Sequence, residues 1–93
     1  MKVRWRNAAE ADRDGIIDYI AQDDPAAAID LGDAIDRQVA ELPQRPRLYR
    51  MGRVKGTREM VVHPKYIVVY RIVSREIEIL RVLHSAQQWP PSL

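Results

Sequence analysis

The sequence predicts an α+β domain in the order β-α-α-β-β-β, with a helical hairpin packed on a small, mainly antiparallel sheet. Residues 7–42 hold two amphipathic patterns with the three-to-four-residue spacing of helices. Residues 58–83 hold three runs of strand-forming residues, and the links between neighbouring elements are short. Such short links favour antiparallel neighbours. The 93 residues contain no internal repeat and no linker, so we expect a single domain over residues 1–93.

The first strand and the first helix are expected near the N-terminus. Lys2–Arg6 alternates polar with large apolar residues, which is typical of a half-buried strand. Asn7 stands three residues before Glu10, a spacing that predicts a capping box and a helix from there to about Gln22. The apolar face of this helix would consist of Ala9, Ile16, Ile17 and Ile20.

A second helix is expected to run to about Leu42. Asp24 is placed to cap its first turn, and Pro25 fits the first helical position, where no amide donor is needed. Pro43 ends it. Its apolar face would consist of Ala28, Leu31, Ile35, Val39 and Leu42. The following segment, residues 43–56, is a basic connector without periodicity.

Three strands are expected in the C-terminal half, with turns at residues 63–65 and 74–76. They are Arg58–Val62, Tyr66–Val73 and Ile77–Leu83. Both alternating faces of Tyr66–Val73 are largely apolar, which indicates a central strand covered on both sides. The helices can cover only one side. The candidates for the other are the tail, residues 85–93 with Trp89 as its apolar anchor, and a bound partner.

Charge is divided unevenly along the chain. Residues 1–44 carry 5 Lys and Arg against 10 Asp and Glu, whereas residues 45–93 carry 10 against 3. The basic half suggests an anionic partner, although mutual attraction of the two halves and simple solvation are alternatives. The densest basic segment holds Arg45, Arg47, Arg50, Arg53 and Lys55.

Several chemistries have no support in the composition. The chain lacks cysteine and has two histidines, which argues against a metal site. Its four glycines form no phosphate-binding loop, so no cofactor is expected. The N-terminal residues contain no apolar signal-peptide core, and no apolar run is long enough to span a bilayer. We therefore expect a cytoplasmic protein without membrane contact.

Metal-free RNA cleavage is one possible chemistry, because it requires a base, an acid and cations around the phosphate. These groups could come from Arg58, Arg71, Arg81, Lys65, His63 and His84, if they converge on one face of the sheet. The alternative for Arg71 and Arg81 is cross-strand pairing with Glu59, Glu76 or Glu78. For His84 the alternative is a local hydrogen bond at the end of its strand.

Three strings extend this reading, because together with the element order they resemble the RelE/ParE superfamily of bacterial type II toxins. They are "IIDYIAQDDPAAAIDLGDAID" (16–36), "GTREMVVHPKYIVVYRI" (56–72) and "EIEILRVLHSAQQWP" (76–90). The resemblance covers nearly the whole chain and implies a toxin neutralised by a cognate antitoxin. Members divide into ribosome-dependent mRNA nucleases of the RelE type and DNA gyrase inhibitors of the ParE type, which are not enzymes.

Departures from the nuclease pattern favour the ParE branch. Nuclease relatives usually place an arginine directly after the tyrosine that opens the penultimate strand, and here Ile67 follows Tyr66. They also carry basic and tyrosine or histidine residues after the last strand, where this chain has Ser-Ala-Gln-Gln-Trp. Losing one preorganised charge contact typically costs about 3–4 kcal/mol of transition-state stabilisation. The resemblance therefore implies a DNA gyrase inhibitor with no catalytic residues and no sequence-specific DNA binding of its own.

Two surfaces follow from this reading. The edge that faces the target would hold Arg71, Arg81, His84 and Trp89. The surface that receives a flexible, acidic, partly helical antitoxin segment would hold Ile16, Ile20, Leu31 and Ile35. The alternatives are an mRNA interferase that uses Arg58, Arg81 and His84, and a degenerate member that binds its antitoxin without being toxic.

Overall fold

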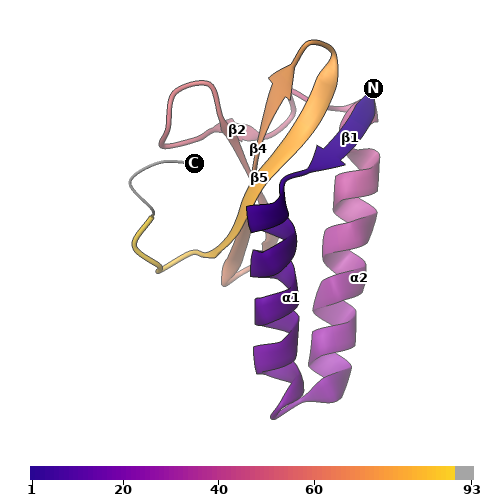
Figure 1. Ribbon diagram of the computed structural model, residues 1–93, viewed down its shortest axis with the longest axis vertical. Helices are drawn as coiled ribbons and strands as arrows, with labels where there is room; N and C mark the ends of the chain where they lie inside the picture. Colours follow the sequence, from indigo (N-terminus) through magenta and orange to yellow (C-terminus); the bar gives the residue numbers. More distant parts are fainter. Residues whose placement is uncertain (90–93) are drawn as a thin grey trace.

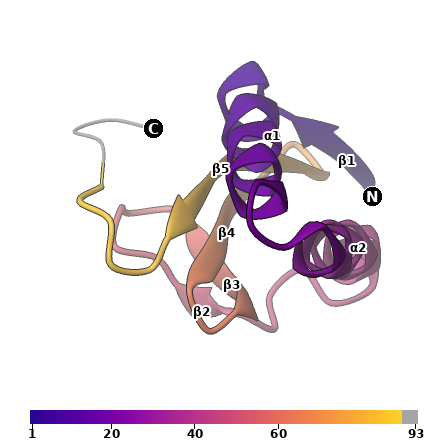
Figure 2. The same ribbon diagram turned by 90° about the horizontal axis from the view of Figure 1, so that it is seen from below.

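The computed structural model describes residues 1–89 and places two helices beside one mixed sheet (Figure 1), which confirms the predicted fold class. Seen along the helices, α1 and α2 lie next to each other on one side of the strands (Figure 2). Within the described residues, neither helix is long and apolar enough to cross a membrane. The elements are β1 (Lys2–Trp5), α1 (Asn7–Ala21), α2 (Pro25–Glu41), the 3-10 turn η1 (Leu42–Gln44), β2 (Arg50–Met51), β3 (Arg58–His63), β4 (Tyr66–Val73) and β5 (Glu76–His84).

The strand order across the sheet is β1-β5-β4-β3-β2, which makes β4 the central strand as predicted. β1 runs parallel to β5, and the other three pairings are antiparallel. The connection between β4 and β5 consists of Ser74 and Arg75 alone, both with positive φ (50° and 64°). The prediction that Glu76 belongs to this turn is wrong, because Glu76 pairs with Val73 and begins β5.

Two local predictions near the helices and the connector are corrected. α1 starts at Asn7 itself, so Asn7 is not the cap, and Arg6 at the cap position makes no side-chain capping bond. Arg6 N–H still donates to Ile79 O at 3.0 Å, so the chain leaves the sheet only there. The connector is not irregular throughout, since it contains η1 and the two-residue strand β2. The cap of α2 is confirmed, because Asp24 Oδ1 accepts from Ala27 N–H at 3.1 Å.

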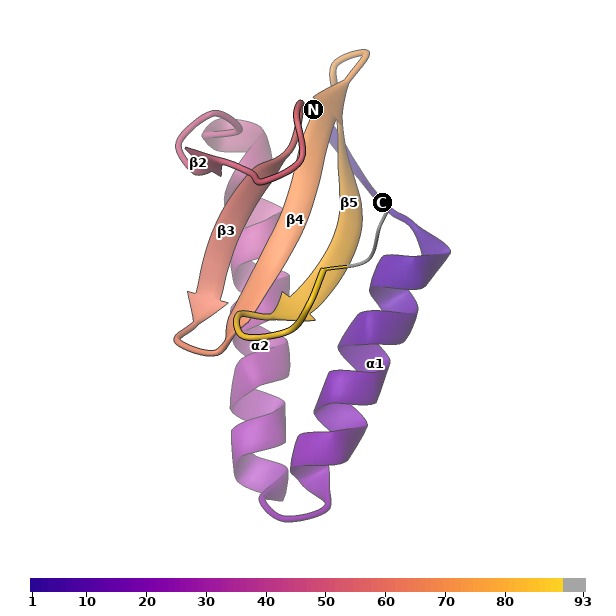
Figure 3. The ribbon, with the colours of Figure 1, turned by 90° about the vertical axis from the view of Figure 1, so that its left-hand side faces the viewer.

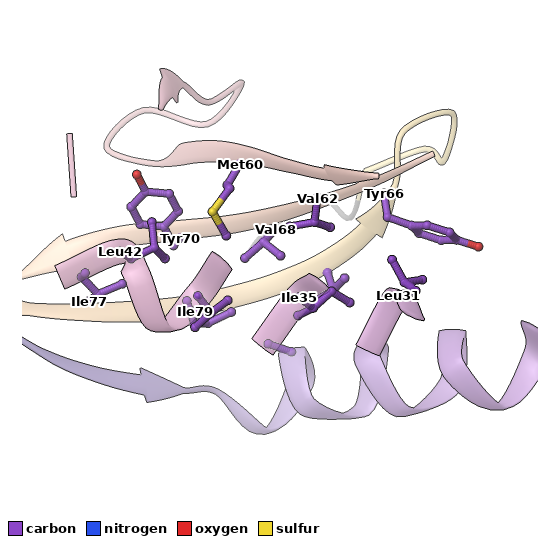
Figure 4. Packing of buried hydrophobic residues seen from close by; sticks show 13 residues of the cluster. Leu31, Ile35, Leu42, Met60, Val62, Tyr66, Val68, Tyr70, Ile77 and Ile79 are labelled. Atoms are coloured by element: carbon purple, nitrogen blue, oxygen red, sulfur yellow. The ribbon is translucent and has the colours of Figure 1, made fainter. Parts of the chain in front are cut away.

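The main core lies between the helices and one face of the sheet. Ile35 and Leu42 from the helical side meet Met60, Val68 and Tyr70 from the strands (Figure 4), and each of the five is at most 1% exposed. Ile16, Ile17 and Ile20 of α1 are partly buried against the same cluster. The predicted apolar faces of both helices therefore point to the sheet.

The other face of the sheet carries a smaller apolar cluster and no helix (Figure 3). Ile67, Val69, Leu80 and Leu83 form it, and Trp89 packs against it. This confirms Trp89 as the tail's anchor; residues 90–93 lie outside the described part of the chain. A β-bulge in β5 changes which residues face each cluster. Val69 pairs with Arg81, whereas the next residue, Tyr70, pairs with Ile79. Leu80 is therefore an extra residue, and the alternation of side chains shifts after it.

Candidate functional site

A groove lies between the helices and the β3–β4 hairpin, with a volume of about 480 Å³. Its walls include Tyr19 and Ile20 of α1, Leu31 of α2, and Val62 and Tyr66 of the hairpin. Figure 4 shows Leu31, Val62 and Tyr66 at the same end of the core. The walls are mostly apolar and six of the ten lining residues come from helices, so an amphipathic segment of another chain fits here better than a small polar ligand.

Two of the four predicted antitoxin-binding residues line this groove. Ile20 and Leu31 contribute to its wall, whereas Ile35 is fully buried in the core and Ile16 packs partly buried against it. Tyr19 was missed, although its side chain lines the groove and is 69% exposed. Its position three residues after Ile16, at the border of the apolar face, is the sequence signal that points to it.

Both histidines lie beside Tyr66 at the edge of the groove. Its ring centroid is 5.7 Å from that of His63 and 5.3 Å from that of His84. His63 Nδ1 accepts from Lys65 N–H at 3.1 Å, and His84 Nδ1 accepts from Ala86 N–H at 3.0 Å. In both rings Nδ1 is therefore used as an acceptor by a nearby backbone amide. Within the described residues, no group of three or more histidine or acidic side chains is placed to hold a metal ion.

Arg58 and His84 do not meet. In the antiparallel register Arg58 lies opposite Tyr70 and His84 lies opposite Tyr66. These positions are four residues apart along β4, or about 13 Å. Arg58 instead ties the connector to the sheet, since Nη1 donates to Tyr49 O at 2.8 Å.

Tyr70 also anchors the connector, from the core side. Its hydroxyl donates to Pro46 O at 2.6 Å. Burial raises the pKa of Tyr70 to about 12, against a smaller lowering by the Arg58 guanidinium. The phenol therefore stays protonated and remains a hydrogen-bond donor, which fixes a segment that has little regular structure.

Arg81 is held by Asp12 of α1. Its Nε and Nη2 donate to the two carboxylate oxygens at 2.6 and 2.9 Å, and this bidentate contact raises the pKa of Arg81 despite partial burial. Asp12 Oδ2 also accepts from Val82 N–H at 3.0 Å, beyond the point where β1 stops covering β5. Cross-strand pairing of Arg81 with a glutamate is therefore wrong. Asp12 was not found from sequence, because it lies 69 positions away.

Arg71 makes the cross-strand pair that the sequence suggested. Its Nε donates to Glu78 Oε1 at 2.6 Å. The other oxygen of Glu78 lies 3.3 Å from Arg4 Nη2 and 3.4 Å from Arg6 Nε. Burial alone would raise the pKa of Glu78, but the hydrogen bond from Arg71 and the charge of Arg6 outweigh it and lower that pKa. The carboxylate is therefore ionised and central to three guanidinium groups.

The basic loop (Arg45, Arg47, Arg50, Arg53 and Lys55) is fastened from inside by Glu59, which is 4% exposed. Glu59 accepts from Arg50 Nη2 and from Arg53 N–H, both at 2.9 Å. Arg45 lies 3.9 Å from Glu41. In residues 1–89 the Arg47 and Lys55 side chains form no ion pair. The loop therefore has a defined shape and keeps part of its charge for solvent or a partner.

The loop and the tail meet at Trp89. The Arg53 guanidinium lies 4.5 Å from the centroid of the Trp89 ring, a cation–π contact. Trp89 Nε1 is buried and has no hydrogen-bond partner in the described chain. An unsatisfied buried donor weakens the attachment of the tail. Of the four predicted target-facing residues, Arg71 and Trp89 thus lie on the sheet face without helices, Arg81 is tied to α1, and His84 sits by the groove.

The same fold occurs in proteins of the RelE/ParE superfamily. A solved structure described as "Chromosomal ParDE TA system from P. aeruginosa" matches with a TM-score of 0.80 at 27% identity, over 90% of this chain and 95% of that chain. The family model for the ParE toxin of the type II toxin–antitoxin system parDE matches residues 3–89. The chain therefore belongs to the ParE toxin family.

Two relatives support the assignment by sequence. Y4kP of Sinorhizobium fredii, which is named as a toxin, is 44% identical over 93 residues, covering 99% of this chain and 96% of its own length. Toxin RelE2 of Caulobacter vibrioides is 37% identical over 90 residues, covering 92% and 97%. The name RelE2 belongs to the nuclease branch, whereas the family model and the P. aeruginosa structure carry the ParE name, so family membership alone does not choose a target.

Proposed function

We propose that this toxin inhibits DNA gyrase without being an enzyme. The supporting observation is Ile67, at the position where nuclease relatives carry an arginine. Ile67 is 3% exposed and belongs to the apolar cluster that Trp89 covers. An apolar side chain under a tryptophan offers no charge to a phosphate. The separation of Arg58 from His84, and the pairing of Arg81 with Asp12, support the same choice.

The proposed partner that neutralises the toxin is a cognate antitoxin whose amphipathic segment occupies the groove. The exposed Tyr19 and the apolar wall from Ile20 and Leu31 support this placement. Segments of this kind fold as they bind and can wrap a large surface. An acidic segment would also find Lys65 at the groove.

The target would bind to the tail and to the sheet face that carries no helix. Removing residues 85–93 should abolish growth arrest while antitoxin affinity stays within about tenfold, or 1.4 kcal/mol, because the groove is retained. Full toxicity of the truncated chain would make the tail irrelevant. A thermal unfolding curve on the same protein separates loss of function from loss of folding.

The deciding experiment is induced expression of the chain alone, with plasmid supercoiling, DNA cleavage by gyrase and mRNA cleavage measured together. We expect gyrase-dependent DNA damage and intact mRNA. His84→Ala is the matched variant for the nuclease alternative, because it removes a histidine that mRNA cleavage would use.

The second candidate function is an mRNA interferase. The relative named RelE2 and the grouping of His63, Tyr66 and His84 favour it. Codon-specific cleavage on translating ribosomes that disappears in His84→Ala would establish this candidate and overturn gyrase inhibition. A chain that binds its antitoxin but causes no growth arrest would be a degenerate, non-toxic member of the family.

A further inference from the structure

Three arginines converge on one carboxylate at the end of the sheet where β1 pairs with β5. Arg71 of β4 and Arg4 of β1 reach Glu78 of β5 from either side, at 2.6 and 3.3 Å, and Arg6 approaches at 3.4 Å. All four lie on the sheet face without helices, since Val3, Trp5 and Ile77 alternate with them and point into the main core. We call these four residues the arginine cluster.

Glu78 holds the guanidinium groups in place and leaves several of their N–H groups without an acceptor. Arg71 donates to it through Nε alone, and in the described chain its two terminal nitrogens have no other acceptor. Arg4 is also 4.0 Å from Glu76 and keeps 58% of its side chain exposed. Each guanidinium has five N–H donors in a planar fork, so several N–H groups of Arg4 and Arg71 face solvent.

The charge balance favours an anion. The Glu78 side chain is 9% exposed and ionised, whereas the Arg71 and Arg4 side chains are 40% and 58% exposed. The buried negative charge is thus covered by positive charge that reaches the surface. Guanidinium groups fixed side by side match the oxygens of a phosphate, to which arginine binds bidentately.

We propose that the arginine cluster is a binding site for the phosphate groups of a nucleic acid backbone. Such contacts carry no base specificity and act through charge. The site lies on the same face as Trp89, away from the groove between the helices and the β3–β4 hairpin. It is independent of the proposed target, because DNA held by gyrase and RNA on a ribosome present the same phosphodiester.

The test uses the purified full chain and a short fluorescent DNA duplex of arbitrary sequence, titrated at several salt concentrations. Each phosphate neutralised adds about −0.9 to the slope of log affinity against log salt. Arg71→Gln and Arg4→Gln should each flatten the slope by about one and weaken binding. Arg37→Gln removes the same charge from the exposed side of α2 and should leave the slope unchanged.

Four results would overturn the inference. One is an absence of measurable duplex binding by the natural sequence. Another is an equal effect of all three substitutions, which would mean that only net charge matters. Vesicles of phosphatidylglycerol bound in place of the duplex would assign the cluster to lipid phosphate. Competition by polyglutamate as strong as competition by unlabelled duplex would assign it to an acidic protein. Arg4→Gln leaves the 2.6 Å Arg71–Glu78 contact intact, so it serves if Arg71→Gln unfolds.

Discussion

Two glycines of this fold differ in how much space surrounds them. Gly52 is the crowded case, because a Cβ atom there would lie 2.2 Å from Thr57 Oγ1 and 3.3 Å from the Thr57 carbonyl carbon. Thr57 cannot yield easily, since it is 3% exposed and its hydroxyl donates to Val54 O at 2.6 Å. Gly15 is the opposite case, with nothing within 4 Å of the same position.

Alanine at these two glycines should therefore have opposite effects on the free energy of unfolding. Gly52→Ala should lower it by about 1–3 kcal/mol through overpacking. Gly15→Ala should raise it by about 0.5–1 kcal/mol, because glycine is a poor helix former and space is available. Urea denaturation of both variants measures this. Equal effects of the two changes would contradict the packing around Gly52.

Glu78 should make stability depend on pH. Its pKa is lowered in the folded state from an ordinary value of 4.5, so it binds a proton less readily folded than unfolded. The resulting stability is fully present above that ordinary value and is lost as pH falls through the folded pKa. Glu78→Gln should therefore flatten the acid side of the profile. Asp33→Asn, at an exposed position of α2, is the control for the charge change.

Elements in this chain are defined partly by their own sequences and partly by distant partners. The apolar spacing of α2 and the composition of β4 are local properties, so both could be predicted. The start of α1 could not, since the bond from Arg6 to Ile79 fixes it. β2 is too short to display a period, and the bulge at Leu80 appears only when β4 and β5 are paired.

The candidate site residues also divide into those whose contacts are local in sequence and those whose partners are distant. Arg71 and Glu78 are cross-strand neighbours in one hairpin, so their pairing followed from the sequence. Asp12, the partner of Arg81, is on another element and left no local signal. The groove was anticipated from the helical faces, but Tyr19 on its rim lies outside the regular apolar stripe.

The β4–β5 turn is an element with an unfavourable local sequence. Ser74 and Arg75 both adopt positive φ, which costs a residue with a side chain roughly 1–2 kcal/mol and favours Asn-Gly in two-residue hairpins. Replacing the pair by Asn-Gly should raise the free energy of unfolding by about 1 kcal/mol, measured by thermal denaturation. Arg75→Ala keeps the Cβ and should bring no such gain.

At the scale of the whole molecule, the groove and the arginine cluster lie on opposite faces of the sheet. The helices lie behind the sheet in Figure 3 and form the groove together with the β3–β4 hairpin. The arginine cluster and Trp89 occupy the opposite face of the sheet. Binding of an antitoxin in the groove and binding of phosphate at the arginine cluster can therefore be tested separately, because substitutions at one site do not touch residues of the other. Energies of such distant sites usually add.

Tyr19→Asp should weaken antitoxin binding by at least about tenfold, because it places a charge in an apolar groove. Ile29→Asp is a close control, since Ile29 is 64% exposed on the neighbouring helix and does not line the groove. Calorimetric titration of both variants with the antitoxin measures the difference. A similar loss for Ile29→Asp would move the binding surface to the outside of the helices.

The parallel pairing of β1 with β5 has a consequence for the order in which the protein is made. Arg4 and Glu78 are 74 positions apart, so at about 5–20 residues per second the first strand waits roughly 4–15 s for its neighbour. The helical hairpin is complete long before that. A nascent chain that ends before Glu76 should therefore be digested by protease at its N-terminus, whereas the released chain is protected. Toxic activity would then begin only after translation ends.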